Sequence, residues 1–209
     1  MVKNGTPFIV FEGIDGAGNS TQSLALKEWL SNKGLKVYLT KEPTDGLIGS
    51  LTRGVLRKEL KVDEETFSLL FAADRMLHIK NIIKKFLNKG IIVISDRYRL
   101  SNYAYQSVMG VEIKWLKCLN EKTMTPDLTF IIDTPPDECI RRKKNQSFYM
   151  ELFENSKKLA KVRKKYYTLA KEESNTFIID GNRPKETVSN EIFEKVIESK
   201  VVPSLVKMN

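Results

Sequence analysis

The chain has 209 residues, of which 41% are hydrophobic and 29% charged, and its formal net charge is +9. These values are typical of one soluble globular domain with a substantial core. No apolar run approaches the roughly 18 residues that span a bilayer, and the N-terminal segment lacks the long apolar stretch of a secretory signal. Cys118 and Cys139 are too few and too far apart for a disulfide framework or a cysteine metal cluster, so we expect a cytoplasmic protein.

Short apolar segments alternate with helical ones along the chain. Strands are predicted at 8–11, 36–40, 91–95, 128–133 and 176–180. Helices are predicted at about 20–33, 48–58, 63–88, 100–122, 136–144, 151–173 and 184–206. Asp63 can cap the third helix, and Gly34 and Gly90 can end two of them. This order predicts one α/β domain over residues 1–209, with a five-stranded parallel sheet flanked by helices on both faces.

A glycine-rich segment follows the first predicted strand. Residues 13–21 read GIDGAGNST, which fits the phosphate-binding pattern G-x-x-x-x-G-K-[ST] except that Asn19 replaces the lysine. In such a loop the backbone N–H groups surround a phosphate, and the next helix directs its N-terminus at it. A chance glycine-rich turn would lack this strand and helix context, so we expect a nucleoside triphosphate site. Its predicted residues are Gly13, Ile14, Asp15, Gly16, Ala17, Gly18, Asn19, Ser20 and Thr21.

Charged residues follow the predicted strands at the sheet edge where ligands of α/β proteins bind. Carboxylates and arginines are costly near a core unless they are paired or bind a ligand. We interpret their gathering as a functional site, and a set of structural ion pairs is the alternative. The residues are Glu12, Asp15, Lys41, Glu42, Asp96, Arg97, Asp133 and Asp180.

Six motifs together resemble those of the thymidylate kinase family in order and spacing, from residue 8 to about residue 180. They are FEGIDGAG at 11–18, KEPTDG at 41–46, LLFAADR at 69–75, DRY at 96–98, SNYAYQ at 101–106 and TPDLTFIIDTPP at 125–136. The resemblance implies a P-loop nucleoside monophosphate kinase fold with a lid at about 141–150. It also implies transfer of a phosphoryl group from ATP to dTMP, Mg²⁺ as cofactor, and a homodimer.

The resemblance further implies roles for single residues. Phe71 would stack on thymine, and Arg75 would contact the base or the acceptor phosphate. Arg97 would hold the acceptor phosphate bidentately. Asp96 would lie near the metal and the hydroxyl of Ser20. Helix core for Phe71 and ion pairs for the arginines and Asp96 are the alternatives.

Five more residues are assigned to the acceptor nucleotide in the same way. Ser101 and Asn102 would read the thymine edge, since an amide offers both a donor and an acceptor. Tyr105 would crowd the sugar 2′ position and so favour deoxyribose. Asp15 would approach the sugar and phosphate, and Glu42 would lie on the acceptor side. Each of the first three, taken alone, is more often a helix surface residue, and Asp15 alone is a turn residue.

Residues 141–165 hold ten Lys or Arg against two Glu. Such a stretch is a solvated face, a nucleic-acid footprint or a clamp on a polyphosphate. Nucleic acid ranks last because no pattern of stacking aromatics accompanies it. Because the loop position is Gly16, the chain resembles relatives whose catalytic arginine lies in the lid, which makes Arg141 and Arg142 candidates. The segment 145–148 is the predicted mobile part, and 182–185 would lie near adenine.

Asn19 lacks the charge and the reach of the lysine that family members carry. Three explanations stay open: an inactivated variant, a member in which a lid Lys or Arg compensates, or a relative that only binds nucleotide. A kinase for another nucleoside monophosphate is a further alternative. The reaction needs no general base, because the acceptor oxygen is already anionic. His78, the only histidine, is therefore expected to have a packing or surface role.

Overall fold

The computed structural model describes residues 5–144, 156–202 and 205. Five parallel strands form one sheet in the order β2-β3-β1-β4-β5. The strands are β1 (Phe8–Glu12), β2 (Val37–Lys41), β3 (Ile92–Asp96), β4 (Leu128–Asp133) and β5 (Thr176–Asp180). The predicted five-stranded parallel sheet is confirmed, and each strand lies within one residue of its predicted bounds.

Helices connect the strands. They are α1 (Asn19–Asn32), α2 (Leu47–Leu56), α3 (Glu64–His78), α4 (Lys84–Leu87), α5 (Arg99–Val108), α6 (Ile113–Leu119), α7 (Pro136–Lys144), α8 (Ser156–Ala170) and α9 (Lys185–Glu198), with a π-helical turn η1 (Ile79–Ile83) between α3 and α4. Asp63 caps α3 as predicted, because its side chain accepts a hydrogen bond from the Thr66 N–H at 2.6 Å.

Three predicted helices differ from the structure. The helix expected over 63–88 contains the π-helical turn, and the one expected over 100–122 is divided into α5 and α6 near Gly110, whose φ is +107°. The last predicted helix ends at Glu198 rather than near residue 206. Residues 151–155 of the predicted 151–173 helix lie outside the described residues.

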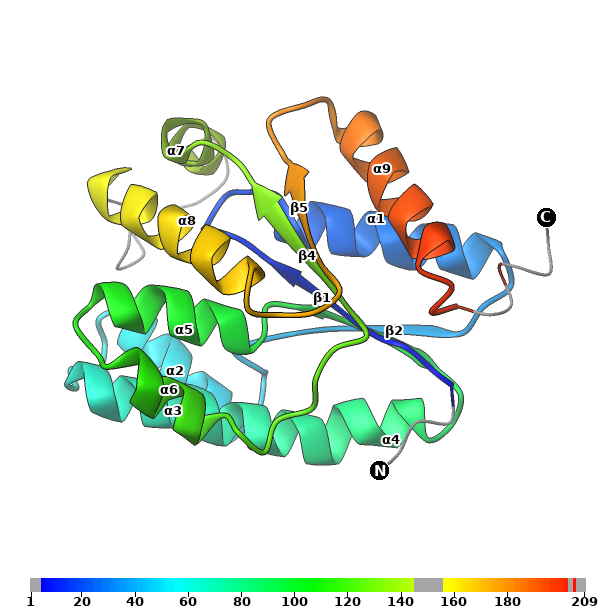
Figure 1. Ribbon diagram of the computed structural model, residues 1–209. Helices are drawn as coiled ribbons and strands as arrows, with labels where there is room; N and C mark the ends of the chain where they lie inside the picture. The colour runs from blue at the N-terminus through cyan, green and yellow to red at the C-terminus, as the bar shows by residue number, and fades with distance from the viewer. Residues whose placement is uncertain (1–4, 145–155, 203–204, 206–209) are drawn as a thin grey trace.

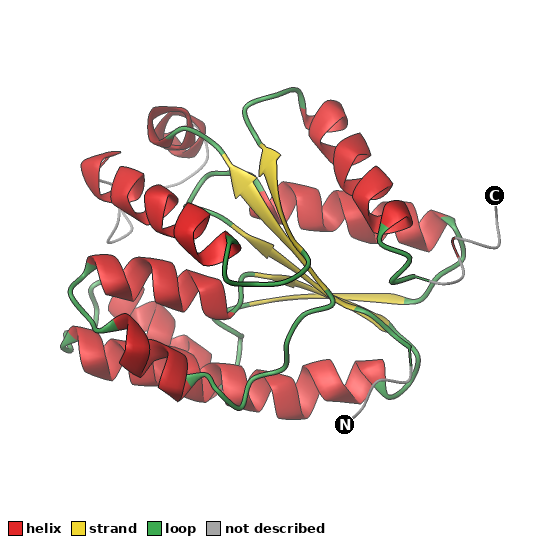
Figure 2. Cartoon of the chain, viewed as in Figure 1, coloured by secondary structure: helices red, strands yellow, loops and turns green. Residues whose placement is uncertain are grey.

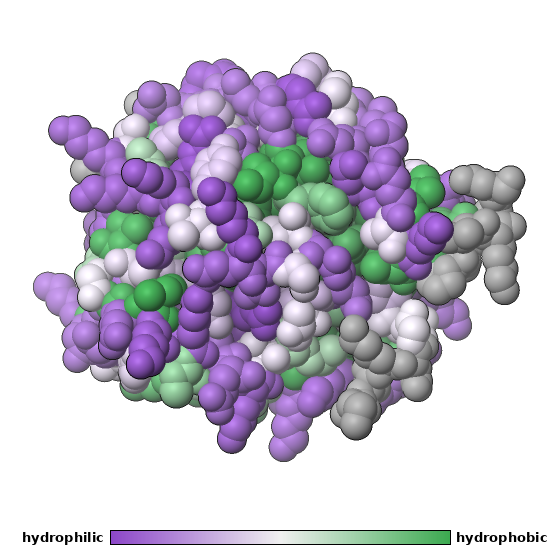
Figure 3. All heavy atoms as spheres, viewed as in Figure 1, coloured by the Kyte–Doolittle hydropathy of each residue, from purple (hydrophilic) through white to green (hydrophobic). Residues whose placement is uncertain are grey.

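The sheet lies between two helical layers (Figures 1 and 2). Helices α1 and α9 pack on one face, and α4, α5 and α8 lie over the other. The four apolar residues of β1, at 8–11, are at most 1% exposed, because helices cover both sides of a central parallel strand. Strand β5 is an edge strand, and Figure 3 shows apolar side chains exposed over it on a mostly hydrophilic face. No helix in the described residues is long and apolar enough to cross a bilayer.

The register aligns the carboxyl ends of the strands. Lys41 and Phe11 both pair with Asp96, and Asp133 pairs with Asp180. The charged residues that follow the strands therefore lie along one edge, as the sequence predicts.

Candidate functional site

The glycine-rich loop joins β1 to α1 at this edge. Gly18 is the N-cap of α1, with φ +115°, and makes no side-chain capping hydrogen bond. The first N–H groups of α1 are thus free of a side-chain cap, as an anion site requires. Gly16 has φ +83°, and a Cβ there would lie 2.6 Å from the Cys139 carbonyl oxygen. Only glycine permits both this backbone conformation and the close approach of α7.

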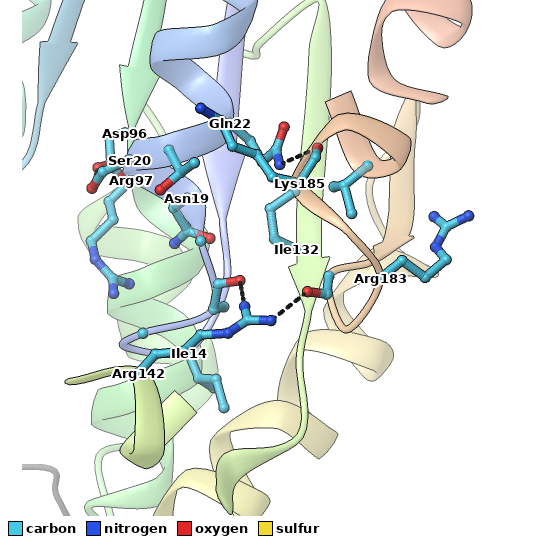
Figure 4. A pocket seen from close by; sticks show the side chains of 16 residues that line it. Ile14, Asn19, Ser20, Gln22, Asp96, Arg97, Ile132, Arg142, Arg183 and Lys185 are labelled. Atoms are coloured by element: carbon cyan, nitrogen blue, oxygen red, sulfur yellow. Dashed lines mark hydrogen bonds between the residues drawn. The ribbon is translucent and has the colours of Figure 1, made fainter. Parts of the chain in front are cut away.

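A cavity of about 400 Å³ opens at the loop (Figure 4). We call it the loop cavity. Its wall combines backbone and polar side chains with the apolar side chains of Ile14, Ile132 and Val188. Four cationic side chains from three different segments complete it. Its lining includes Ile14, residues 16–22, Asp96, Arg97, Arg142, Arg183 and Lys185. Arg183 and Lys185 belong to the segment predicted to lie near adenine.

Asn19 lies in the wall of the loop cavity with its side chain folded back onto the loop. Its Nδ2 donates to the Gly13 carbonyl at a long 3.5 Å, and its Oδ1 is buried without a hydrogen-bond partner among the described residues. A 3.5 Å contact is at the limit of a hydrogen bond. The amide therefore neither reaches into the cavity nor supplies charge. The positive charge that neutralises a bound triphosphate has to come from other side chains.

Arg142 is one of those cations. It donates to the carbonyl oxygens of Ala17, at 3.2 Å, and Gly181, at 3.1 Å, so it joins the loop to the segment after β5 (Figure 4). Arg141 points elsewhere: its side chain is 70% exposed and pairs with Glu138 at 2.7 Å. Hydrogen bonds from both arginines lower the pKa of Glu138 to about 2. Of the two predicted lid arginines, only Arg142 lines the cavity.

Ser20 and Asp96 meet on the other side of the loop cavity. The Ser20 hydroxyl donates to the Asp96 carboxylate. A hydroxyl and a carboxylate are hard oxygen ligands of the kind that Mg²⁺ takes, and nucleotide sites commonly supply only one or two of them. Within the described ranges no three His, Cys, Asp or Glu side chains cluster as a metal site.

Arg97 occupies the centre of the site. Its φ is +73°, and sparsely populated conformations of non-glycine residues concentrate at functional sites. Its guanidinium pairs with Asp15 and donates to the Gly13 carbonyl at 2.9 Å and to the Ser101 hydroxyl at 3.0 Å. Burial alone would lower the pKa of Arg97, but Asp15 and nearby tyrosines raise it well above its usual value. The guanidinium thus links the loop to α5.

A second cavity, of about 230 Å³, lies beyond Arg97. We call it the Phe71 cavity. It combines an aromatic and aliphatic wall with convergent polar groups, which suits a planar heterocycle bearing carbonyl and N–H groups. Its lining residues are Asp15, Lys41, Glu42, Pro43, Arg53, Leu56, Phe71, Arg97, Ser101, Tyr105 and Gln106. Arg97 is common to both cavities, so they adjoin.

Tyr105 fixes the wall of the Phe71 cavity near the loop. Its hydroxyl accepts a hydrogen bond from the Asp15 N–H at 2.9 Å, and the Arg97 guanidinium lies 5.6 Å from its ring centre. Burial and the carboxylate of Asp15 raise the pKa of Tyr105 well above its usual value, so the phenol stays neutral. The structure thus brings together the predicted residues Asp15, Arg97, Ser101 and Tyr105.

The profile of the thymidylate kinase family matches residues 11–192. A probable thymidylate kinase of Thermococcus kodakarensis is 43% identical over 196 residues, covering 88% of this chain and 94% of that protein. Proteins of the same name from Methanocaldococcus jannaschii and Methanosphaera stadtmanae are 41% and 38% identical, covering 88% and 91% of this chain and 93% and 97% of their own lengths. The chain belongs to the thymidylate kinase family.

Two residues assigned to the acceptor nucleotide, Arg75 and Asn102, lie behind the Phe71 cavity rather than in its lining. Arg75 is 1% exposed, and its guanidinium bonds to the Glu42 carboxylate at 2.8 Å, the Asn120 Oδ1 at 2.6 Å and the Tyr98 carbonyl at 3.2 Å. This ion pair is the alternative role predicted for Arg75 from its sequence. Asn102 is equally buried. Direct contact of either residue with a nucleotide stays a prediction.

His78 is buried in the same region. Its Nδ1 lies 2.9 Å from Glu42 Oε1, and its Nε2 lies 2.8 Å from the Thr40 hydroxyl. The imidazole thus holds the carboxylate that binds Arg75, which agrees with a packing role.

Two polar residues of the Phe71 cavity were not predicted from the sequence. Gln106 ends the quoted motif SNYAYQ, and this position was the available signal. Arg53 comes from α2, where no motif marks it; it donates to the carbonyls of Pro43, at 3.2 Å, and Thr44. The predicted lid residues 145–150 lie outside the described residues.

Glu12, at the end of β1, is a buried carboxyl that binds residues next to the site. It is fully buried and accepts hydrogen bonds from the Ser101 hydroxyl at 2.5 Å, the Tyr98 N–H at 3.0 Å and the Tyr166 hydroxyl at 3.1 Å. Burial raises the pKa of Glu12 to about 7, although the Ser101 hydrogen bond and Arg97 act in the opposite direction.

Proposed function

We propose that this protein transfers the γ-phosphoryl group of ATP to dTMP, giving dTDP and ADP, in the cytoplasm. The observation that carries the proposal is the position of Arg97, which lines both the loop cavity and the Phe71 cavity. ATP in the loop cavity and dTMP in the Phe71 cavity would place their phosphates against the same guanidinium. The adjoining cavities thus suit two nucleotides bound end to end.

Catalysis rests on alignment and charge. The attacking oxygen belongs to a phosphate that is already anionic, so the enzyme has to overcome repulsion and hold the two phosphates in line. Arg97 offers a planar guanidinium for bidentate binding of the acceptor phosphate, and Asp15 fixes its orientation. Arg142 supplies positive charge at the loop, where the lysine of the phosphate-binding pattern is missing.

Ser20 and Asp96 would hold Mg²⁺, since their oxygens meet at the wall of the loop cavity and match its ligand preference. The ion, when bound, would neutralise charge on the donor phosphates.

A coupled assay of dTDP formation with ATP and Mg²⁺ tests the proposal. We expect turnover with dTMP, weaker turnover with dUMP, and little with UMP or CMP, because Tyr105 restricts the sugar. Faster turnover of UMP or CMP would overturn the assignment of the acceptor. Chelation of Mg²⁺ with EDTA should abolish turnover.

The buried, uncharged Asn19 favours one second candidate, a kinase relative that binds nucleotides with little or no turnover. Calorimetric titrations with dTMP and with ATP separate the two: binding of both without dTDP formation would support the second candidate. Absence of dTMP binding would contradict both.

We also propose a homodimer, supported by exposed apolar side chains on α2 and α3. Leu69, Met76 and Leu77 on α3 are 40–48% exposed, and Leu47 on α2 is 88% exposed. A groove of about 980 Å³ has Leu47 and Leu77 in its wall. Helix α5 offers no comparable apolar surface, because its residues 100–106 are buried within the protomer. Leu77→Glu should yield monomers in light scattering, whereas Ile178→Glu, at the exposed site on β5, should not; a dimeric Leu77→Glu variant would contradict this interface.

A further inference from the structure

A buried carboxylate joins Arg97 to helix α8. Glu12 is fully buried, and its Oε2 accepts hydrogen bonds from two hydroxyls, that of Ser101 at 2.5 Å and that of Tyr166 at 3.1 Å. Ser101 in turn accepts a hydrogen bond from Arg97 Nη1 at 3.0 Å. Ser101 and Tyr166 are 8% and 2% exposed, so little solvent competes for these bonds. The contacts thus run from the guanidinium at the centre of the site to a helix whose residues 156–170 line neither cavity.

The direction of these hydrogen bonds follows from their two ends. A guanidinium can only donate and a carboxylate can only accept, so the Ser101 hydroxyl receives from Arg97 and donates to Glu12. The phenol of Tyr166 donates to the same carboxylate. Burial raises the pKa of Tyr166 well above its usual value, and the charge of Glu12 acts in the same direction, so the phenol keeps its proton.

Glu12 holds Arg97 at two points. Besides the bond through Ser101, its Oε1 accepts a hydrogen bond from the Tyr98 N–H at 3.0 Å, in the main chain directly after Arg97. Arg97 has a φ of +73°, which is unfavourable for a residue other than glycine and has to be maintained by its surroundings. Both the backbone turn and the guanidinium of Arg97 are thus held through one carboxyl group.

This arrangement requires Glu12 to be ionised. A neutral carboxyl accepts more weakly, and an O–H on Oε2 would compete with the two hydroxyls that donate there. The charged and titratable side chains that face Glu12 are Arg97 after β3, Arg75 on α3 and Tyr166 on α8. Burial raises the pKa of Glu12 to about 7, while the Ser101 hydrogen bond and both arginines act in the opposite direction. A hydrogen bond to the charged form favours that form, so the Tyr166 hydroxyl helps to keep Glu12 ionised near neutral pH.

We propose that Tyr166 is a positioning residue: its phenol holds Glu12 as an acceptor, and the carboxylate, through Ser101, orients Arg97 for the acceptor phosphate. This inference rests on the proposed function and adds to it a residue of α8 that lines neither cavity. A role in orientation predicts that the benefit of the hydroxyl depends on pH. A role of the ring in packing alone predicts the same loss at every pH.

Tyr166→Phe removes the hydroxyl and keeps the ring. Without this donor the pKa of Glu12 rises, so the carboxylate persists only at higher pH. We expect the calorimetric dissociation constant of dTMP to increase by roughly tenfold at pH 6 and to change little at pH 9. The ionisation of the dTMP phosphate contributes equally to the wild type and the variant, so the comparison between them removes it.

Tyr167→Phe is the matched control, because it removes the hydroxyl of the neighbouring tyrosine, which donates to Asp133 instead of Glu12. It should keep the wild-type dissociation constant at each pH. Replacement of Tyr166 by 3-fluorotyrosine makes the opposite change. A more acidic phenol is a stronger donor, so the weakening of dTMP binding should begin at a lower pH than in the wild type.

A loss of affinity in Tyr166→Phe that is equal at pH 6 and pH 9 would mean that the residue only packs, and it would overturn the inference, as would an unchanged dissociation constant at pH 6. If thermal unfolding shows that Tyr166→Phe does not fold, the 3-fluorotyrosine variant decides, and an unshifted pH dependence overturns the inference. Wild-type protein that binds dTMP without forming dTDP contradicts the proposed phosphoryl transfer, and the binding comparison still decides the role of Tyr166. Absence of dTMP binding would contradict both.

Discussion

The loop cavity and the Phe71 cavity are built in different ways. Side chains behind the Phe71 cavity are buried and bonded to one another, as in the set formed by Arg75, Glu42 and His78. In the loop cavity, Arg142 bonds to backbone carbonyls, and the Asn19 Oδ1 has no hydrogen-bond partner in the part of the chain that the structure describes. The Phe71 cavity is therefore organised before any ligand arrives, whereas the departure from the phosphate-binding pattern lies wholly in the loop cavity.

Arg97 belongs to both cavities, so its removal should give the largest effect. In Arg97→Leu we expect kcat/KM for dTMP to fall by roughly 10²–10³, the cost of losing a preorganised charged donor. Asp15 would also lose the guanidinium with which it pairs. Steady-state kinetics with dTMP and ATP varied in turn would measure the loss.

Arg97→Lys is the matched control for this prediction. It keeps the charge but not the planar fork, so we expect an intermediate loss. A near-normal kcat/KM in Arg97→Leu would contradict this prediction, because the two cavities would then not depend on Arg97 as a common residue.

The buried Glu12 carboxyl, which lies behind the Phe71 cavity, should make the free energy of unfolding depend on pH. Its pKa of about 7 in the folded protein exceeds the usual 4.5, so the native state binds the proton more tightly. The free energy of unfolding should therefore fall as the pH rises from about 4.5 to above 7, by an amount on the order of 3 kcal/mol. Urea unfolding of wild type and Glu12→Gln at pH 5 and pH 8 should show a flatter dependence in the variant; parallel curves would contradict it.

Asn19→Lys tests whether the loop cavity lacks a positive charge that catalysis requires. The lysine restores a cation at the loop, so we expect kcat to rise at least tenfold, or about 1.4 kcal/mol in the barrier. The KM for dTMP should stay near its wild-type value, since residue 19 does not line the Phe71 cavity. An unchanged kcat would mean that another cation already supplies the charge.

Substitutions of Arg142 and Arg141 can be compared directly, and we expect them to give the smallest change in kinetics. Both bond to Glu138, but only Arg142 lines the loop cavity. Arg142→Met should raise the KM for ATP by roughly fivefold, about 1 kcal/mol, whereas Arg141→Met should change it little. Equal effects would show that the lid cations act through charge alone.

The sheet and the loop could be predicted from the sequence because both depend on local patterns. Strands buried on two faces appear as continuous apolar runs, and the glycine spacing marks the loop. Asp63 carried its own capping signal three residues before Thr66.

The orientation of buried polar groups could not be predicted in this way. Phe71 and Arg75 lie four residues apart, which places them near one face of α3, but the partners of Arg75 come from positions 42, 98 and 120. Only the folded chain brings those atoms together. The same holds for the different directions of Arg141 and Arg142, which are neighbours in sequence.

The contact at Gly16 has a mechanical consequence. Gly16 has only a hydrogen atom where another residue has its Cβ, so the Cys139 carbonyl of α7 packs directly against the glycine-rich loop. Close-packed elements transmit small displacements instead of absorbing them. A triphosphate that widens the loop by a fraction of an ångström would therefore push α7 outward. Binding in the loop cavity would in this way displace the helix that carries Arg141 and Arg142.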